Sequence, residues 1–337
     1  MLFVFLSCKD PVDQAAKKRI FSAEDPPQAV AAATEKLPPE NVAAKPEVAR
    51  RVLGMGAAEA TERIGPHEYK ASILWDWQIA EQPDIKLKET RSLSAGPGGV
   101  SGDFIARLFN ERNAGLEVIR VNNQVFARST YGSDGAAKFR ERKRDRGMAE
   151  RSREEAYGAL RDYDALFLGR MKLSEAGTSL IDGRTAWKYT VTLTDKAPSA
   201  AKLPPIAVPK NGIDETTKRR LHFFEARIPK SLEGEVFVDA DTSVVLRARL
   251  DGRMTVKGTE GDAELRLLLE SSLSSIGANP GVKVPAEFLP DEDKPQGIAA
   301  AMERFGIERQ IPDAGPRPTG VGKKPTTSPD EPQDEQE

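Results

Sequence analysis

The sequence predicts a mainly β (α+β) domain, in which a single large antiparallel sheet of about ten strands curves into a half-barrel with one or two helices on its concave face. Three observations support this prediction. Apolar and polar residues alternate with a period of two through most of the middle of the chain, turn dipeptides separate the alternating segments, and one long segment has the period of an amphipathic helix.

The alternating segments read as half-buried strands, because successive side chains of a strand point to opposite faces of the sheet. Trp187, Tyr189 and Val191 alternate with Lys188 and Thr190. The same period is found at residues 73–79, 85–87, 104–108, 236–238, 244–250, 254–256 and 265–269. No strand-linked GxGxxG or GxxxxGK[ST] phosphate-binding motif accompanies these strands.

Turn dipeptides lie between the alternating segments. Asn122-Asn123, Asp182-Gly183 and Asp251-Gly252 are each flanked by predicted strands. Type I′ hairpin turns need positive φ at both central residues, and Asn, Asp and Gly tolerate this conformation best. We therefore expect three tight hairpins at these positions, with further turns at Asp134-Gly135 and Asn211-Gly212.

One helix is expected among the strands, at residues 148–168. Ala156, Leu160, Tyr163 and Phe167 lie on one stripe of this segment, and its charged residues lie elsewhere. A helix with one apolar stripe packs that stripe against a sheet. We expect the sheet to curl around it.

The flanks of the chain differ in composition from its middle. Residues 9–66 are rich in Ala, Pro, Glu and Lys, which predicts a flexible linker, with a helix at 47–64 as the one element that this segment offers. Residues 290–337 are acidic and rich in Pro, which predicts a mostly disordered tail. The curved sheet domain is therefore expected at residues 67–289.

The lone cysteine, Cys8, follows the apolar run at residues 2–6 and a small residue, Ser7. This pattern is similar to a bacterial lipoprotein signal, in which the cysteine becomes lipidated, and residues 1–8 would be its remnant. Because the apolar run is short and lacks a preceding Lys or Arg, we expect the true translation start upstream. The alternative is a chance hydrophobic N-terminus on a cytosolic protein.

Composition narrows the chemistry. With 50 basic and 52 acidic side chains the net charge is −2, which does not favour general nucleic-acid binding. The chain has two histidines and one cysteine, which argues against a zinc site, and it has no GxSxG nucleophile motif. His222 is interpreted as a packed strand histidine. No catalytic residue, metal or cofactor is expected, and the chain is predicted to be non-enzymatic.

Two segments carry a resemblance to a known family. The first is residues 177–193, in which Gly177, Gly183 and Trp187 follow one another in a strand–turn–strand pattern. The second is residues 232–240, with Gly234, Val238 and Asp239 in a strand and turn that lead into residues 242–256. Over about residues 69–276 the chain resembles the periplasmic lipoprotein carriers of the LolA/LolB-like superfamily. The resemblance implies a lipid-anchored cell-envelope protein, facing the periplasm or the cell surface, and it assigns neither the inner nor the outer membrane. No functional residue of the family maps onto this chain.

The alternating segments carry more large apolar residues than one helix can cover. This surplus predicts an apolar groove for acyl chains of a lipid or lipoprotein. The candidate lining residues are Trp75, Trp77, Phe104, Leu108, Trp187, Tyr189, Phe224, Val236, Leu246, Leu250 and Leu267. The alternative function is a structural module that fills this face with its own side chains and docks another envelope protein.

The sharpest local charge feature is the basic run at residues 138–146. It is interpreted either as a solvated loop or as a contact with anionic headgroups or an envelope polymer. Its candidate contact residues are Lys138, Arg140, Arg142, Lys143, Arg144 and Arg146.

Overall fold

The computed structural model describes residues 28–79, 83–131, 137–143, 145, 147–195, 223, 225–257 and 262–291. All of these residues belong to one compact unit, residues 1–291. Several predicted features lie outside the described residues. They are Cys8, the Asp134-Gly135 turn, the Asn211-Gly212 turn and His222 in the segment 196–222, and the predicted tail beyond residue 291.

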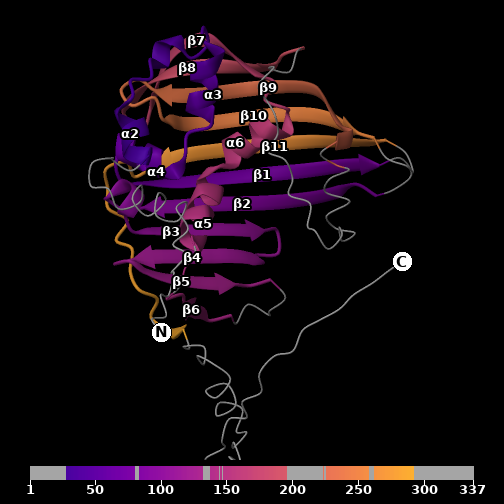
Figure 1. Ribbon diagram of the computed structural model, residues 1–337. Coiled ribbons are helices and arrows are strands. Elements are labelled where there is room, and N and C mark those ends of the chain that lie inside the picture. Colours follow the sequence, from indigo (N-terminus) through magenta and orange to yellow (C-terminus); the bar gives the residue numbers. More distant parts are fainter. Residues whose placement is uncertain are drawn as a thin grey trace, which may run out of the picture. The chain divides into compact units, whose positions relative to one another are not determined.

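The described strands form one open, curved sheet with the order β12-β6-β5-β4-β3-β2-β1-β11-β10-β9-β8-β7 (Figure 1). Every neighbouring pair is antiparallel except β12 and β6, which confirms the predicted fold class. The strands are β1 (His67–Ile79), β2 (Ile85–Ala95), β3 (Phe104–Asn110), β4 (Gly115–Val121), β5 (Gln124–Ser129), β6 (Phe139–Glu141), β7 (Met171–Ile181), β8 (Arg184–Leu193), β9 (Arg227–Asp239), β10 (Val245–Val256), β11 (Ala263–Ser274) and β12 (Phe288–Leu289).

The two faces of the sheet differ in chemistry. Along β1, Tyr69, Ala71 and Ile73 are buried and point to the face that carries the helices, called the inner face below, whereas Lys70 and Ser72 point to the opposite, outer face. The antiparallel register pairs Trp75 with Leu267 and thereby continues the apolar inner face onto β11. The period-two pattern of the sequence is therefore the pattern of burial.

Two of the expected hairpin turns form where the sequence places them. Asn122 and Asn123 join β4 to β5 with φ of 50° and 60°, and Asp182 and Gly183 join β7 to β8 with φ of 47° and 80°. The expected turn at Asp251-Gly252 is wrong, because both residues lie inside the continuous strand β10. Gly252 is needed there for a different reason, which is the close approach of a helix.

The expected helix at 148–168 is present as two helices, α5 (Met148–Tyr157) and α6 (Ala159–Leu166), which meet at Gly158. A Cβ at Gly158 would lie 2.7 Å from the Glu154 carbonyl oxygen. The predicted apolar stripe is buried as a whole (Ala156, Leu160, Tyr163 and Phe167). Figure 1 shows α5 over β3 and β4 and α6 over β10 and β11, both on the inner face.

Residues 28–66 depart from the expected flexible linker. They form α2 (Gln28–Thr34), a 3-10 turn η1 (Pro39–Asn41), α3 (Pro46–Leu53) and α4 (Ala57–Ile64), so the helix expected at 47–64 is split at the Gly54–Gly56 bend. Val42, Val52 and Leu53 belong to the main hydrophobic core. The Ala-rich composition that suggested disorder instead lets small residues sit close to other helices, and Ala57 and Ala60 are fully buried.

No helix among the described residues is long and apolar enough to cross a membrane.

Candidate functional site

Helices α5 and α6 fill the central part of the inner face. Tyr163 of α6 is fully buried and donates a hydrogen bond of 2.9 Å from its hydroxyl to the carbonyl oxygen of Leu267. Arg227, the first residue of β9, donates from Nε to the carbonyl oxygen of Leu166 at 2.9 Å. These bonds fix α6 onto the sheet at a position where the apolar side chains of the strands would otherwise face solvent.

Arg91 holds the helices from the β2 side of the sheet. Its side chain is 9% exposed, and its guanidinium donates to the Glu155 carbonyl oxygen at 2.9 Å and pairs with the carboxylate of Asp162. Burial lowers the pKa of Arg91, but Glu89 and Asp162 outweigh it and raise the pKa above its usual value. The cation therefore stays charged and clamps the junction of α5 and α6.

Most of the predicted lining residues lie in the filled part of the inner face. Each is buried within the main hydrophobic core of the domain, with no more than 9% of its surface exposed: Phe104, Leu108, Tyr189, Val236, Leu246, Leu250 and Leu267. Trp187 is half-buried against the same core, and Phe224 lies outside the described residues. Over this region the inner face is filled by the chain's own side chains.

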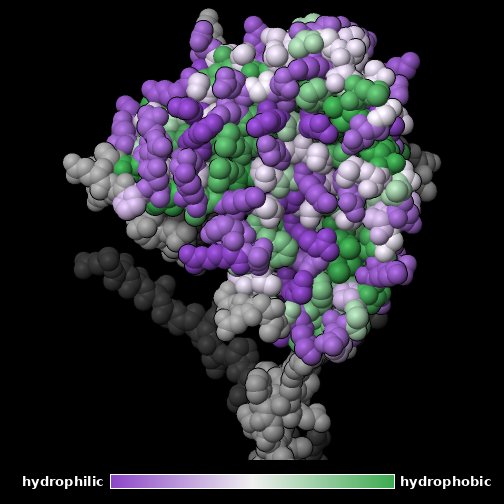
Figure 2. All heavy atoms as spheres, turned by 180° about the vertical axis from the view of Figure 1, so that it is seen from behind, coloured by the Kyte–Doolittle hydropathy of each residue, from purple (hydrophilic) through white to green (hydrophobic). Residues whose placement is uncertain are grey.

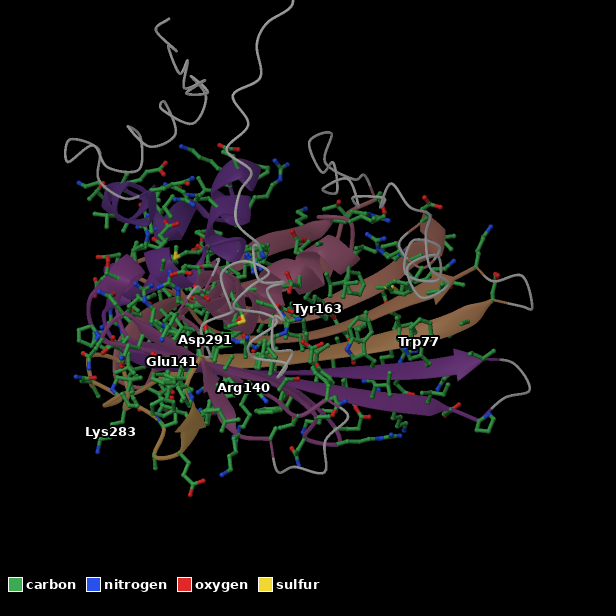
Figure 3. All side chains as sticks on the ribbon, turned by 60° about the horizontal axis from the view of Figure 1, so that its bottom comes forward. Trp77, Arg140, Glu141, Tyr163, Lys283 and Asp291 are labelled. Carbon is green, nitrogen blue, oxygen red and sulfur yellow. The ribbon has the colours of Figure 1, made fainter. Side chains whose placement is uncertain are left out.

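The inner face is open at one end, on β1 and β2 beyond α6. Trp75 and Trp77 are half-buried, and their register partners Leu87 and Ile85 are 42% and 45% exposed. The ring of Phe223 lies 5.7 Å from the ring of Trp77. Figure 3 shows Trp77 near the arrowhead end of β1, farther along the strand than Tyr163. We call Trp75, Trp77, Ile85 and Leu87 the apolar end.

The apolar end stands out among the exposed residues of the domain. Isolated exposed apolar side chains are common on protein surfaces, but neighbouring ones on a single face indicate a binding surface. Its four residues form two adjacent cross-strand pairs, Trp75–Leu87 and Trp77–Ile85. The arrangement offers an apolar strip on a rigid sheet and has no acid, base or nucleophile within it.

The outer face carries the larger hollows. One of about 670 Å³ is lined by side chains of β3, β2, β1, β11 and β10, and a second of about 770 Å³ lies beside it over β2, β1, β11, β10 and β9. Figure 2 views the domain from behind and shows hydrophilic side chains over much of this face. By contrast, two cavities on the inner side measure about 20 Å³ beside Tyr69 and Tyr157 and about 280 Å³ between α3 and β7.

The basic run lies near one edge of the sheet, on and beside β6, which pairs with the edge strand β12. Lys138, Arg140, Arg142 and Lys143 are exposed, and Arg144 and Arg146 lie outside the described residues. The Lys138 ammonium is 3.5 Å from the Glu287 carboxylate, and the Lys143 backbone N–H donates to the Asp291 carboxylate at 3.1 Å. Part of the run thus faces acidic residues at the end of the described chain, and none of its described residues lies at the apolar end.

The described residues contain no group of three or more His, Cys, Asp or Glu side chains arranged to hold a metal ion. His67 is buried at the start of β1, where its Nδ1 lies 2.9 Å from the Gly65 carbonyl oxygen. Burial lowers its pKa, and its ring packs edge-on against Tyr157 at 6.2 Å. These contacts are those of a core residue.

Fold and site together define a curved-sheet domain with a filled centre and one open apolar end. No family model matches the chain, and no curated protein matches it. Among solved structures it is similar to LprF from Mycobacterium bovis, with 14% identity over 72% of this chain and 99% of that chain and a TM-score of 0.27.

Two further solved structures are also similar to this chain. MucB in complex with MucA(peri) has 15% identity over 68% of this chain, a TM-score of 0.23, and 57% of its own length covered. A LolA superfamily protein from Nitrosomonas europaea has 9% identity over 66% of this chain and 91% of that chain, with a TM-score of 0.19. The similar solved structures thus include a member of the superfamily that the sequence resembles. At these identities and TM-scores we take no function from them.

Proposed function

We propose that this chain is a non-enzymatic cell-envelope protein, lipid-anchored through Cys8, whose apolar end binds an acyl chain of a lipid or lipoprotein. The observation that carries the proposal is the pair of cross-strand contacts Trp75–Leu87 and Trp77–Ile85, which leave two large aliphatic side chains more than 40% exposed on the inner face. Neighbouring exposed apolar side chains on one face indicate an interaction site.

The chemistry of the strip suits a methylene chain. Burial of apolar surface is non-directional and contributes about 0.8 kcal/mol for each methylene, so a contact of five methylenes is worth about 4 kcal/mol. Two indole rings provide broad, flat contact surfaces beside the aliphatic side chains. The filled region under α6 sets the depth to which a chain reaches, because Leu267 and Leu265 next to the tryptophans are already buried.

A direct binding titration tests this function on the full-length protein. A fluorescent fatty-acid analogue is titrated into wild type, Trp77→Ala and Leu87→Asp. Leu180→Asp is the matched control, because Leu180 is 70% exposed on β7, away from the apolar end. We expect Trp77→Ala and Leu87→Asp to weaken binding about tenfold, whereas Leu180→Asp binds like wild type. Circular dichroism checks that each variant keeps its sheet.

The second candidate function is a docking module for another envelope protein. The observation that favours it is the burial of the inner face by the chain's own side chains between α5, α6 and the strands. If the wild type binds no analogue at tens of micromolar and no lipid accompanies it in native mass spectrometry, the docking module replaces the acyl-chain proposal.

A further inference from the structure

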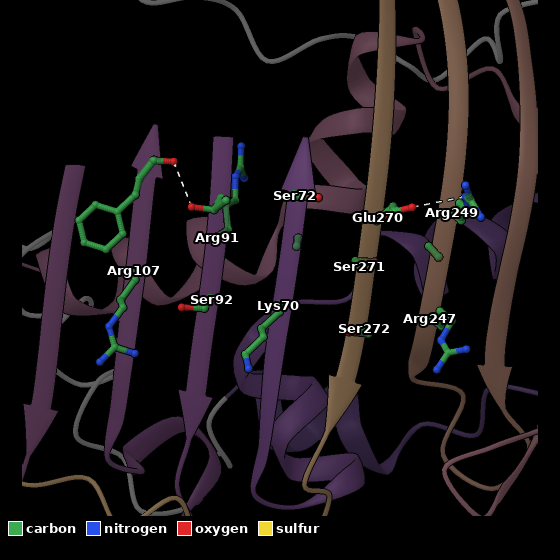
Figure 4. Close-up of a pocket in the computed structure, with 14 residues that line it drawn as sticks. Lys70, Ser72, Arg91, Ser92, Arg107, Arg247, Arg249, Glu270, Ser271 and Ser272 are labelled. Carbon is green, nitrogen blue, oxygen red and sulfur yellow. Dashed lines mark hydrogen bonds and ion pairs between the residues drawn. The ribbon is translucent and has the colours of Figure 1, made fainter. Parts of the chain in front are cut away.

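A single row of side chains crosses the outer face of the sheet over five adjacent strands. Its members are direct register partners, each paired with the next: Arg107 of β3, Ser92 of β2, Lys70 of β1, Ser272 of β11 and Arg247 of β10. Cations and hydroxyls therefore alternate along this row, which we call the outer row. Figure 4 shows all five residues around the hollow of about 670 Å³.

The three cations of the outer row are accessible to a ligand. The Lys70 side chain is 71% exposed, and its nearest carboxylate, Glu68, is 3.8 Å away. The Arg107 side chain is 38% exposed and pairs with Glu117, which it shares with Arg128. Arg247 is exposed, and no acidic side chain of the described residues forms an ion pair with it. The row contains no acid of its own.

A second row lies beside the first and forms the other wall of the hollow. It runs Phe109, Thr90, Ser72, Glu270 and Arg249 over the same strands. Glu270 is its one acid and is 3.4 Å from Arg249, an ion pair drawn in Figure 4. The small hydroxyl residues make the floor and the long cationic side chains make the rim. The hollow is therefore positively charged overall, because its lining holds more cations than acids.

The spacing of the cations selects the ligand. Neighbouring strands are about 4.8 Å apart, so cations on every second strand recur at about 9.6 Å. A polyproline II chain has three residues per turn and rises about 3.1 Å per residue, so every third side chain returns to the same face after about 9.3 Å. The two repeats match across the three cations of the row.

We propose that the outer row binds an extended acidic peptide segment of a partner protein, with carboxylates at positions i, i+3 and i+6 facing Arg107, Lys70 and Arg247. The serines between the cations donate hydrogen bonds to the peptide's carbonyl or carboxylate oxygens. Recognition is by side chains alone, because all five strands already have a neighbour on both sides in the sheet and offer no free edge. The site lies on the face opposite the apolar end and is independent of acyl-chain binding.

The test compares two labelled peptides of the same composition with the full-length protein, by fluorescence anisotropy. One peptide has three Glu-Pro-Pro repeats, and the other has its three Glu residues in one block. We expect the repeating peptide to bind about threefold or more tightly than the block, and each of Lys70→Ala and Arg247→Ala to weaken it about threefold. Arg112→Ala is the control, because that side chain is 86% exposed in the β3–β4 turn, outside the hollow. Raising the salt from about 0.05 to 0.5 M should also weaken binding.

Equal affinity for the repeating and the block peptide would overturn the proposal, since spacing would then play no part. Equal loss in Arg112→Ala would overturn it as well, because general surface charge would explain the binding. If anionic vesicles or single-stranded DNA bind the wild type, lose affinity in Lys70→Ala and Arg247→Ala, and outcompete the repeating peptide, the row serves a membrane or a nucleic acid and the peptide proposal is wrong.

Discussion

Gly252 of β10 lies directly beneath the ring of Phe167. A Cβ at Gly252 would approach the Phe167 Cζ to 2.2 Å and the Tyr163 hydroxyl oxygen to 2.7 Å. The helix end therefore touches the strand backbone itself, and the two aromatic rings, stacked with centroids 5.0 Å apart, occupy the centre of the inner face. This contact closes the middle of the half-barrel and leaves the apolar end as its open part.

Gly252→Ala should destabilise the domain by about 2 kcal/mol, because the added methyl overlaps the Phe167 ring and the Tyr163 hydroxyl and forces α6 away from the sheet. Urea unfolding followed by circular dichroism measures this change. Ser231→Ala, at an exposed position on neighbouring β9, is the control. Phe167→Leu in the Gly252→Ala background should recover part of the loss, and a double variant with simply additive losses would contradict the contact.

Arg184 and Asp239 join two turns of the sheet. The guanidinium donates to both carboxylate oxygens at 2.7 and 2.9 Å, and Thr242 donates to the same carboxylate from its backbone N–H at 2.9 Å. Burial would raise the pKa of Asp239, but the hydrogen bonds from Arg184 and Thr242 outweigh it and hold the pKa below its usual value. Arg184→Ala leaves a fully buried carboxylate without its cation.

We expect Arg184→Ala to lower the free energy of unfolding by about 3 kcal/mol at pH 7. Asp241→Ala is the matched control, since Asp241 is 87% exposed and lies 3.9 Å from the same guanidinium, and it should cost little. Because the folded pKa of Asp239 lies below 3.8, the stabilisation is present above pH 3.8 and is lost as the pH falls through the folded pKa. Equal losses in the two variants would contradict the buried pair.

Asp164 of α6 should reduce stability as the pH rises. Burial raises its pKa from 3.8 to about 6, against the backbone N–H of Met171 and the Arg50 charge, which lower it. Between these two values the unfolded chain gives up the proton while the folded chain keeps it, so folding becomes less favourable from pH 3.8 to about 6.

Asp164→Asn removes this titration. The shift of about two pKa units sets an upper limit of about 3 kcal/mol on the gain in stability at pH 7, and the gain should vanish near pH 3. Thermal unfolding across this pH range measures it, with the exposed Asp195→Asn as control. A gain that is the same at both ends of the range would show that the carboxyl is not the cause.

Cys8 is predicted to carry lipid in the cell. Labelled palmitate should enter the wild-type protein and not Cys8→Ser, because Cys8 is the only cysteine of the chain. The Cys8→Ser protein should also leave the membrane fraction, since an acylated cysteine supplies its attachment. Incorporation that survives the substitution would refute lipidation at this residue.

The fold class was predictable from the sequence because it depends on local rules. Alternation along β1, β8 and β11 follows from the geometry of a strand, and the turns at Asn122-Asn123 and Asp182-Gly183 follow from the residues that tolerate positive φ. The stripe of Ala156, Leu160, Tyr163 and Phe167 likewise identified the buried side of α5 and α6. Each of these signals is contained in a few neighbouring residues.

Other features depend on contacts between distant residues, which no local pattern contains. Gly252 resembled a turn residue because Asp-Gly is a turn dipeptide, and only the position of Phe167 shows that it makes room for a helix. Residues 28–66 have the composition of a linker, but contacts with distant residues fix them on the domain. The Tyr189 hydroxyl donates to the Pro39 carbonyl oxygen, and Glu154 accepts from the backbone N–H of Ala57 at 2.9 Å.

The candidate sites show the same division. The sequence alone determined which apolar side chains share a face of each strand, and so it placed Trp75 and Trp77 together on the apolar face of their strand. Only the tertiary structure decided that α6 covers Leu267 and stops short of Trp77, and that Arg107, Lys70 and Arg247 fall into one row. The physical reason is that strand register and helix position are set by packing across the whole sheet, where a shift of one residue would exchange the two faces.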